Sequence, residues 1–450
     1  MSPVPSQSKP SYKGSTLRIL LAMRGDRLSF LQKLKEQHGD VVRFRVATQA
    51  VWVLSHPEHI RDVLVVNQKK FMKGRGIQMM KPLLGEGLLT SEGEFHLRQR
   101  RLVQPAFHRQ RVASYATSMV EDARKIRERW AMLPPGESLE MSQEMMRLTL
   151  VIAGRTLFDA DVEDEANDVG QALTDAMSVA ERIPNPLAAI LSRLPLPSNR
   201  RFAKARQRLD DIIYGIIRER RASNVDRGDF LSMLLLAQDE EGGTGGMTDQ
   251  QVRDEALTIF LAGHETTATA LTWTWYLLSQ HPEAEAKLHA EIDAVLQGRL
   301  PTFEDLPKLR YAEMVFAEAM RLYPPAWIIG RRALVEHEMD GFKIKAGDLT
   351  LHSQYLVHHD ARWFPEPDKF IPERWTPELK ESRPKFSYFP FGGGTRTCIG
   401  EAFAWMEASL VIATLAQQWK PRLVPGHPVE PRALITLRPK HGMKMYLEKR

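Results

Sequence analysis

The chain has 450 residues, of which 43% are hydrophobic and 26% are charged. This is the composition of an ordinary globular protein and excludes a largely disordered chain. At roughly 100–200 residues per domain, the length allows two or three domains or one large domain built around a cofactor. The formal net charge is +6 at pH 7. Because Lys and Arg form no run of five or more, we expect no nucleic-acid partner.

The single cysteine, Cys398, excludes an internal disulfide bond, which indicates a reducing compartment. Residues 1–15 are polar and proline-rich, and we expect this segment to be flexible. The apolar stretch that follows, Leu17–Met23, contains Arg18 and is too short for a signal sequence or a membrane span. We therefore expect a soluble, cytoplasmic monomer with no membrane anchor.

Strands are predicted near both ends of the chain, around a long helical middle. Alternating apolar residues predict a hairpin from Val41–Val46 and Ala50–Leu54. A second strand pair is predicted around Gly341–His352, with its turn at Gly347-Asp348, and a third near Leu434–Leu437 and Met443–Leu447. Apolar residues at helical spacing predict helices at Ser114–Trp130, Met141–Phe158, Asn199–Arg221, Pro282–Leu296 and Tyr311–Leu322. This order predicts one mainly α domain with small β-sheets (α+β) over residues 1–450.

One predicted helix is unusually long. Thr248 and Gln251 form a capping-box pattern, and helical character persists to Gln280. About 32 residues at 1.5 Å each span roughly 48 Å. The segment is apolar, but its centre carries His264–Thr267, and an ionisable residue there costs about 2.5–3.5 kcal/mol in a bilayer. We therefore predict a buried helix whose polar centre is a functional site.

The glycine-rich segment Phe391–Gly400 surrounds Cys398. A cysteine thiolate can bind haem iron, and it stays ionised where backbone N–H groups and positive charge are close. Glycines let the backbone approach the sulfur, and the helix predicted from Glu401 directs its N-terminal dipole toward it. A lone cysteine is more often a small buried hydrophobic residue. The pattern around Cys398 favours an iron ligand instead.

The same segment matches the haem-binding signature of the cytochromes P-450, Phe-x-x-Gly-x-[His/Arg]-x-Cys-x-Gly, at every fixed position. The chain resembles this family over nearly its whole length. In the long helix, Ala262–Thr267 matches the family's [Ala/Gly]-Gly-x-[Asp/Glu]-Thr-Thr motif. The resemblance implies the cytochrome P-450 fold, with haem b bound between the long helix and the cysteine loop. It also makes Cys398 the axial ligand of the haem iron.

The resemblance also implies catalytic roles in the long helix. Gly263 allows the backbone to lie close to the haem face, and a threonine hydroxyl that bonds the i−4 carbonyl can open a groove for dioxygen. Cleaving the O–O bond requires two protons, which an adjacent carboxylate and hydroxyl can relay with water. Thr266 and Glu265 are therefore the expected catalytic residues. The alternative for this pair is a helix cap or a solvated surface position.

The two haem propionates need cationic or hydrogen-bonding partners. The family's Trp-x-x-x-Arg is His96 and Arg100 here, and the histidine can still donate a hydrogen bond. Arg396 and Arg331 complete the set, although the adjacent Arg332 is an alternative to Arg331. The cofactor-binding residues implied by the resemblance are His96, Arg100, Ala262, Gly263, Thr267, Arg331, Pro390, Phe391, Gly392, Arg396, Cys398 and Gly400.

Glu318 and Arg321 have the three-residue spacing of a routine surface ion pair. The family combines such a Glu-x-x-Arg with an arginine in a Pro-Glu-Arg-Phe-like segment, here Pro372–Trp375. The resemblance implies a structural triad of Glu318, Arg321 and Arg374 that holds the cysteine loop.

The substrate is the least determined feature. By family position, the pocket is expected to contain Met79, Leu261, Trp327, Ile328 and Leu434. These residues suit a sizeable hydrophobic substrate, and a fatty acid, a terpenoid and a steroid all remain open.

The implied activity is insertion of one oxygen atom of O2 by hydroxylation or epoxidation. We expect the haem domain to account for the whole chain. Electrons from NAD(P)H would then arrive through a separate ferredoxin or flavodoxin with its reductase. One alternative is a haem-thiolate peroxygenase or isomerase, against which the intact Glu265-Thr266 pair argues. The other is a non-catalytic haem sensor.

Overall fold

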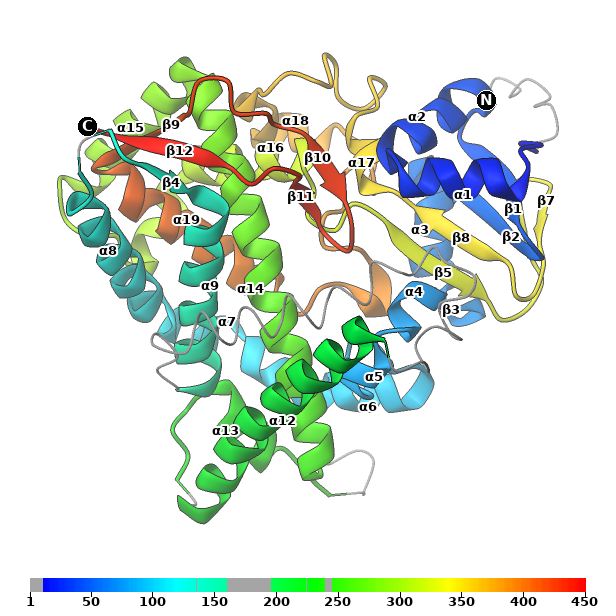
Figure 1. The fold of residues 1–450 in the computed structure, drawn as a ribbon, viewed down its shortest axis with the longest axis horizontal. Coiled ribbons are helices and arrows are strands. Elements are labelled where there is room, and N and C mark those ends of the chain that lie inside the picture. The colour runs from blue at the N-terminus through cyan, green and yellow to red at the C-terminus, as the bar shows by residue number, and fades with distance from the viewer. Residues whose placement is uncertain (1–10, 135, 160–195, 224, 239–244) are drawn as a thin grey trace.

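The structure is a computed structural model that describes residues 11–134, 136–159, 196–223, 225–238 and 245–450. Most of the helices gather on one side of the molecule, and the five-stranded sheet lies on the other side together with α1 and α2 (Figure 1). Residues 1–10, part of the segment expected to be flexible, lie outside the described residues. In the remainder of that segment, the Tyr12 N–H donates to the Arg43 carbonyl at 2.8 Å.

The predicted helices are confirmed to within two residues at each end. The longer helices are α1 (Thr16–Arg24), α2 (Arg27–His38), α6 (Gly93–Val103), α8 (Ala116–Ala131), α9 (Met141–Phe158), α12 (Pro197–Ser223), α13 (Phe230–Leu236), α14 (Asp249–Gln280), α15 (Pro282–Leu296), α16 (Arg310–Leu322) and α19 (Glu401–Ala416). The short helices are α3 (Pro57–Arg61), α4 (Arg75–Gln78), α5 (Lys81–Leu84), α7 (Arg109–Ser114), α17 (Gln354–His358) and α18 (Pro377–Glu381).

The described strands form one sheet in the order β1-β2-β8-β5-β3, a second in the order β4-β12-β9, and the pairs β10-β11 and β6-β7. Their bounds are β1 (Val41–Val46), β2 (Gln49–Leu54), β3 (Phe71–Lys73), β4 (Ser138–Glu140), β5 (Ile329–Ala333), β6 (His337–Met339), β7 (Phe342–Ile344), β8 (Leu349–His352), β9 (Trp419–Leu423), β10 (Pro431–Ala433), β11 (Leu437–Pro439) and β12 (Lys444–Lys449).

The first predicted hairpin is confirmed as β1 and β2, but the other two predicted pairings are wrong. β7 pairs with β6, whereas β8 runs parallel to β2 and antiparallel to β5. Residues 434–436 form the turn between β10 and β11, and β12 pairs with β4 and β9. Alternating apolar residues mark a strand and its buried face, but the partner of each strand is chosen by tertiary packing.

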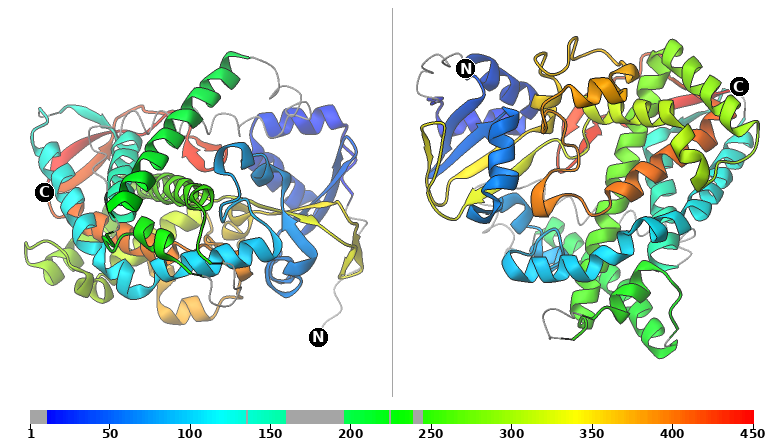
Figure 2. Two further views of the ribbon diagram at one scale, coloured as in Figure 1. Left: turned by 90° about the horizontal axis from the view of Figure 1, so that it is seen from below. Right: turned by 180° about the vertical axis from the view of Figure 1, so that it is seen from behind.

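The long helix is confirmed as α14, and its first turn is closed by the predicted capping box of Thr248 and Gln251. In the left view of Figure 2, which looks nearly along α14, helices lie to one side of it and the five-stranded sheet to the other. The side chains of Trp273 and Trp275 in α14 are buried. Among the described helices, none combines the length and apolarity needed to cross a bilayer.

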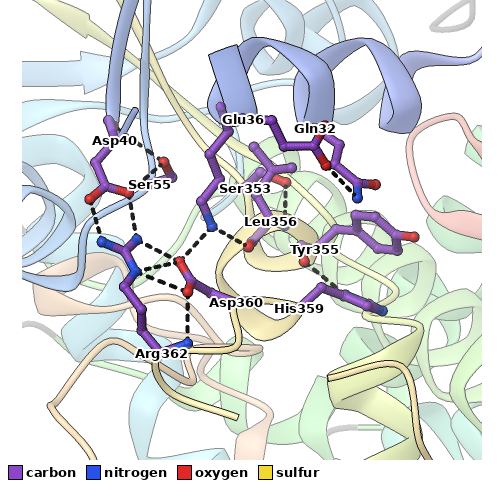
Figure 3. A network of polar contacts seen from close by, with 11 residues as sticks. Gln32, Glu36, Asp40, Ser55, Ser353, Tyr355, Leu356, His359, Asp360 and Arg362 are labelled. Carbon is purple, nitrogen blue, oxygen red and sulfur yellow. Dashed lines mark hydrogen bonds and ion pairs between the residues drawn. The ribbon is translucent and has the colours of Figure 1, made fainter. Parts of the chain in front are cut away.

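A polar network joins α2 to the segment after α17 (Figure 3). Asp360 accepts hydrogen bonds from Lys35 Nζ at 2.6 Å and from Arg362 Nε at 3.1 Å. Arg362 also holds Asp40, with Nη1 2.7 Å from the carboxylate. Burial would raise the pKa of Asp360, but the hydrogen bonds from Arg362 and Lys35 outweigh it and lower the pKa to about 2. The network fastens the N-terminal helices to the chain that leads toward Cys398.

A second buried network is built on Glu318 of α16. Glu318 and Arg321 are fully buried, and two parallel hydrogen bonds of 2.8 Å join them. Arg374 Nε lies 3.2 Å from Glu318 Oε1, and Trp375 Nε1 lies 2.9 Å from Oε2. Arg321 also donates to the carbonyls of His358, Pro367 and Lys369. The three charged side chains therefore come together, and they hold the segment that precedes the cysteine loop.

Replacing Glu318 by Gln should destabilise the protein by about 3–5 kcal/mol, because it leaves two buried arginines without their counter-charge. Urea unfolding of the purified protein measures this loss, and haem content after expression should fall with it. Glu128→Gln is the matched control, since Glu128 forms an exposed ion pair with Arg124, and it should change little. Equal stabilities for the two variants would contradict the structural role of Glu318.

Candidate haem site

Cys398 lies in a tight loop just before α19. Its N–H donates to the Phe391 carbonyl at 2.9 Å, and the Gly400 N–H donates to its sulfur. Gly394 has a φ of 69°, and a Cβ at this position would lie 2.1 Å from the Leu64 carbonyl oxygen. Only glycine fits there, because other residues rarely adopt this φ and the contact would be a severe clash. The loop is thereby held in one conformation.

The Cys398 side chain is exposed, although protein surrounds the loop that carries it. Burial raises the pKa of the thiol, and Glu401 adds to this. The Gly400 N–H, Arg100 and Lys73 act in the opposite direction. The sulfur is accessible to a ligand and is surrounded by partial and full positive charge. Such a thiol loses its proton when it binds a metal ion.

A cluster of basic side chains from four segments lies beside this loop. We call it the cation cluster, and its members are Lys73 of β3, His96 and Arg100 of α6, Arg331 of β5, and Arg396. Burial, and then the four positive neighbours, lower the pKa of His96 to about 3. Burial and then Arg396 lower the pKa of Arg331 to about 10. His96 is therefore a neutral hydrogen-bond donor among crowded positive charges.

Contacts with other segments of the chain hold these side chains in place. Lys73 and Arg331 are cross-strand partners of β3 and β5. Arg396 donates to the Ser91 carbonyl at 2.8 Å and forms an ion pair with Glu92. Arg100 donates to the carbonyl of Thr397, the neighbour of Cys398, at 2.9 Å. The cation cluster is thus attached directly to the cysteine loop.

The cation cluster fits a group with two negative charges. Lys73, Arg100, Arg331 and Arg396 are basic, and Glu92 is the carboxylate that opposes them. Burial, and then the charge of Arg331, lower the pKa of Lys73. Buried like charges repel strongly, and carboxylates at hydrogen-bond distance are their best partners. A haem carries two propionates and needs an axial ligand, and the chain supplies both sets of partners side by side.

Successive side chains of a strand point to opposite faces of the sheet, so Arg331 and Arg332 of β5 point in opposite directions. Arg331 belongs to the cation cluster, whereas Arg332 Nη2 lies 2.8 Å from the Met72 sulfur on the other face. Lys73 was missed by the sequence reasoning. The sequence shows Lys73 directly after two apolar residues, Phe71 and Met72, in a segment that was not predicted to be a strand.

The polar centre of α14, residues 262–267, has one accessible face. Ala262 is exposed although most of α14 is buried. Thr266 lies one turn later, on the same face, and its hydroxyl donates to the Ala262 carbonyl at 2.7 Å. A Cβ on Gly263 would meet no described protein atom within 4 Å. This face therefore has room for a ligand.

The remaining residues of this centre are held by α9 and by β11 with the turn before it. Thr149 of α9 donates to the His264 carbonyl at 2.9 Å. Glu265 is buried and accepts hydrogen bonds from Thr436 Oγ1 at 2.5 Å and from Arg438, with which it forms an ion pair at 2.6 Å. Glu265 is therefore fixed to β11, with its charge balanced by Arg438.

The other predicted residues are placed as follows. Pro390, Phe391 and Gly392 open the cysteine loop, and the Phe391 ring lies 5.8 Å from that of Trp405. Among the expected pocket residues, Leu261 and Trp327 are buried, Met79 is exposed, and Ile328 and Leu434 are half-buried. The structure brings two of them together, since Trp327 Nε1 donates to the Leu434 carbonyl at 2.9 Å. Their role in substrate binding stays a prediction.

Replacing Lys73 by Met should have opposite effects on the haem-free and haem-bound forms. The haem-free protein should become more stable, by about 1–4 kcal/mol, because repulsion within the cation cluster falls. Haem should leave faster, because a propionate partner is lost. Urea unfolding and the rate of haem transfer to apomyoglobin measure the two effects. Lys69→Met, at a nearby exposed lysine, should change neither. Slower haem loss from Lys73→Met would contradict the assignment.

The comparisons with known proteins agree with this geometry. The family model described as cytochrome P-450 matches residues 12–444. Cyclooctatin synthase of Streptomyces melanosporofaciens is 42% identical, covering 93% of this chain and 90% of the relative. Cyclooctat-9-en-7-ol 5-monooxygenase of the same organism is 41% identical, covering 89% and 86%. Pentalenene oxygenase of Streptomyces avermitilis is 36% identical, covering 91% and 90%. The chain therefore belongs to the cytochrome P-450 family and is a haem-thiolate monooxygenase.

Proposed function

We propose that this monooxygenase inserts one oxygen atom of O2 into a cyclic terpenoid. The observation that carries this proposal is a sequence similarity. Over most of its length this chain is similar to relatives whose names specify cyclooctat-9-en-7-ol and pentalenene as substrates. Both are hydrophobic compounds of the terpenoid class. The apolar residues expected around the site suit such a substrate better than a fatty acid, whose carboxylate would need a basic partner.

In this proposal the haem, when bound, supplies the iron at which dioxygen is reduced. Cys398 holds the iron and the cation cluster holds the propionates. Thr266 presents a hydroxyl on the accessible face of α14. Its proton is engaged with the Ala262 carbonyl at 2.7 Å, and a rotation about χ1 would free it from that carbonyl. Glu265, the adjacent acid, would serve as a proton relay once its contact with Arg438 loosens.

Electrons come from redox partners, and we propose a ferredoxin or flavodoxin with its NAD(P)H-dependent reductase. We further propose that the chain is one haem-binding domain and works as a cytoplasmic monomer. A peroxygenase, an isomerase or a haem sensor has no need of the adjacent Glu265 and Thr266, because none of them takes protons to activate O2. The presence of this pair supports the monooxygenase.

A panel of substrates tests the proposed class. Purified holoprotein whose reduced, carbon-monoxide-bound form shows a strongly red-shifted Soret band should be mixed with cyclic terpenoid hydrocarbons and alcohols, fatty acids and steroids. The terpenoids should shift the Soret band by displacing the distal water and, with surrogate redox partners, should yield products that carry one added oxygen. Turnover of fatty acids or steroids without turnover of any terpenoid would overturn the substrate class.

Thr266→Ala should lower the product formed per NADPH by roughly tenfold or more, since a positioned proton donor typically contributes 10²–10⁴-fold. Consumption of NADPH should continue, with hydrogen peroxide released instead of product. Thr272→Ala is the matched control, because Thr272 makes the same i−4 hydrogen bond in the same helix, to Ala268 at 2.7 Å. If Thr266→Ala and Thr272→Ala couple NADPH to product equally well, the role of Thr266 is wrong.

A further inference from the structure

Residues 74–91 form a loop that starts and ends at the cation cluster, and we call it the bridging loop. The N–H of Lys73, just before the loop, donates to Glu92 Oε1, just after it, at 2.7 Å. Gln78 Nε2, within the loop, donates to the same oxygen at 3.1 Å. Helices α4 and α5 of this loop lie between α14 and the five-stranded sheet (Figures 1 and 2). The base of the bridging loop is therefore closed beside the residues that would hold the haem.

The middle of the bridging loop is fastened to α14 by the backbone of three consecutive residues. The Glu86 N–H donates to Asp254 Oδ2 at 2.9 Å. The Leu88 N–H donates to Glu255 Oε2, also at 2.9 Å. Between them, a Cβ on Gly87 would lie 2.6 Å from the Asp254 carbonyl oxygen, so only glycine lets the two backbones approach this closely. Two carboxyl groups of α14 therefore hold the loop at its middle, as Glu92 holds it at its base.

Glu255 lies on the same face of α14 as the accessible residues of the site. Successive residues of an α-helix are about 100° apart, so residues seven and eleven positions later return to nearly the same direction. Those residues are Ala262, which is exposed, and Thr266, which is half-buried. At 1.5 Å per residue, Ala262 is roughly 10 Å along the helix from Glu255. The bridging loop therefore covers the continuation of the face that is accessible at Ala262.

The two carboxyl groups differ in how their charge is balanced. Asp254 forms an ion pair with Arg253 at 3.0 Å. Glu255 is 0% exposed, and the groups that donate to it, the Leu88 N–H and Gln99 Nε2 at 3.1 Å, are neutral. Burial raises the pKa of Glu255 to about 7, and the charge of Asp254 adds to this, although the two hydrogen bonds oppose it. Glu255 therefore changes between its neutral and its charged form near neutral pH.

Charged and titratable groups on the neighbouring elements surround this contact. They are Arg253 and Asp254 of α14, Asp210 of α12, Asp229 at the start of α13, Lys81, Glu86 and Glu92 in or next to the bridging loop, and Glu94, His96 and Arg98 of α6. Lys81 is paired with Glu86, and Arg253 is paired with Asp210 as well as with Asp254. Asp254 is the charged group that shifts the pKa of Glu255. Since Asp254 stays paired, the contact should titrate as a single acid, Glu255.

We propose that Glu255 keeps the bridging loop closed on α14 while its carboxyl group is neutral and allows the loop to open when it ionises. Opening would bring water to Glu255, whose carboxyl group titrates near 4.5 in water. The closed loop therefore binds the proton more tightly than the open loop does. The stability of the closed loop is fully present below about pH 4.5 and falls as the pH rises to about 7, above which it changes no further. Opening extends the accessible face of α14 by about two turns.

Hydrogen exchange of the wild-type holoprotein tests the closure directly. Peptides that cover residues 85–92 should be followed by mass spectrometry between about pH 5.5 and 8, and their rates corrected for the intrinsic pH dependence of exchange. Exchange of these peptides should become faster by up to roughly tenfold per pH unit below about pH 7 and then level off. Peptides of the β1–β2 hairpin should show no such change. Unchanged protection of residues 85–92 over this range would overturn the proposal.

Two variants of Glu255 should move the loop in opposite directions. Glu255→Gln cannot ionise and keeps the shape of the side chain, so the loop should stay protected at every pH. Glu255→Ala removes the contact with Leu88, so the loop should exchange fast at every pH. Glu291→Gln is the matched control, because Glu291 is another partly buried acid with a raised pKa that accepts the N–H groups of Tyr311 and Ala312. It should keep the wild-type profile, whereas a wild-type profile in Glu255→Gln would contradict the role of Glu255.

Carbon monoxide measures whether the loop limits entry to the haem, because its own charge does not change with pH. In the wild type, its association with the reduced holoprotein after flash photolysis should become severalfold faster between about pH 5.5 and 7.5. Glu255→Gln should stay at the slow rate and Glu255→Ala at the fast rate. Neither this readout nor hydrogen exchange needs a substrate, so both stay valid if the proposed terpenoid class is wrong. Equal rates at the two pH values in the wild type would overturn the role of the bridging loop in ligand entry.

Discussion

Excess positive charge buried beside Cys398 is the constraint on which the haem site depends. Two ionic networks lie close to the cysteine loop, and they differ in how complete they are. In the Glu318 network, the carboxylate, two arginines and several carbonyls satisfy one another. In the cation cluster, four basic side chains face the single carboxylate of Glu92. The first network is closed and holds the fold, whereas the second keeps an excess of basic groups that suits an anionic ligand.

The excess of basic groups in the cation cluster explains why the cysteine loop is held so tightly. A cluster of buried positive charges would push its members apart if the backbone could yield. The left-handed Gly394 against Leu64 and the bond from Arg100 to the Thr397 carbonyl hold the loop against that repulsion. The sulfur is therefore positioned before any ligand arrives. Preorganisation of this kind lowers the cost of binding, since little of the site has to be ordered afterwards.

The polar centre of α14 follows the same logic with hydrogen bonds. Thr149 and Arg438 come from two different elements and fix the residues around Thr266, while Thr266 itself stays on the accessible face. The helix thus presents one reactive hydroxyl and keeps its other polar groups engaged with the protein.

The sequence by itself determined the chemistry of this protein and the elements that carry it. Cys398 in its glycine-rich loop, the Ala262–Thr267 motif and the capping box at Thr248 are local patterns, so spacing along the chain was enough to locate them. Tertiary structure alone decided which strands pair, which of Arg331 and Arg332 joins the cation cluster, and that Lys73 and Arg438 lie beside the residues singled out from the sequence. These depend on contacts between residues tens to hundreds of positions apart. Burial and charge interactions depend on distances in space. A local sequence pattern therefore does not show which distant side chains will be buried together or will interact through their charges.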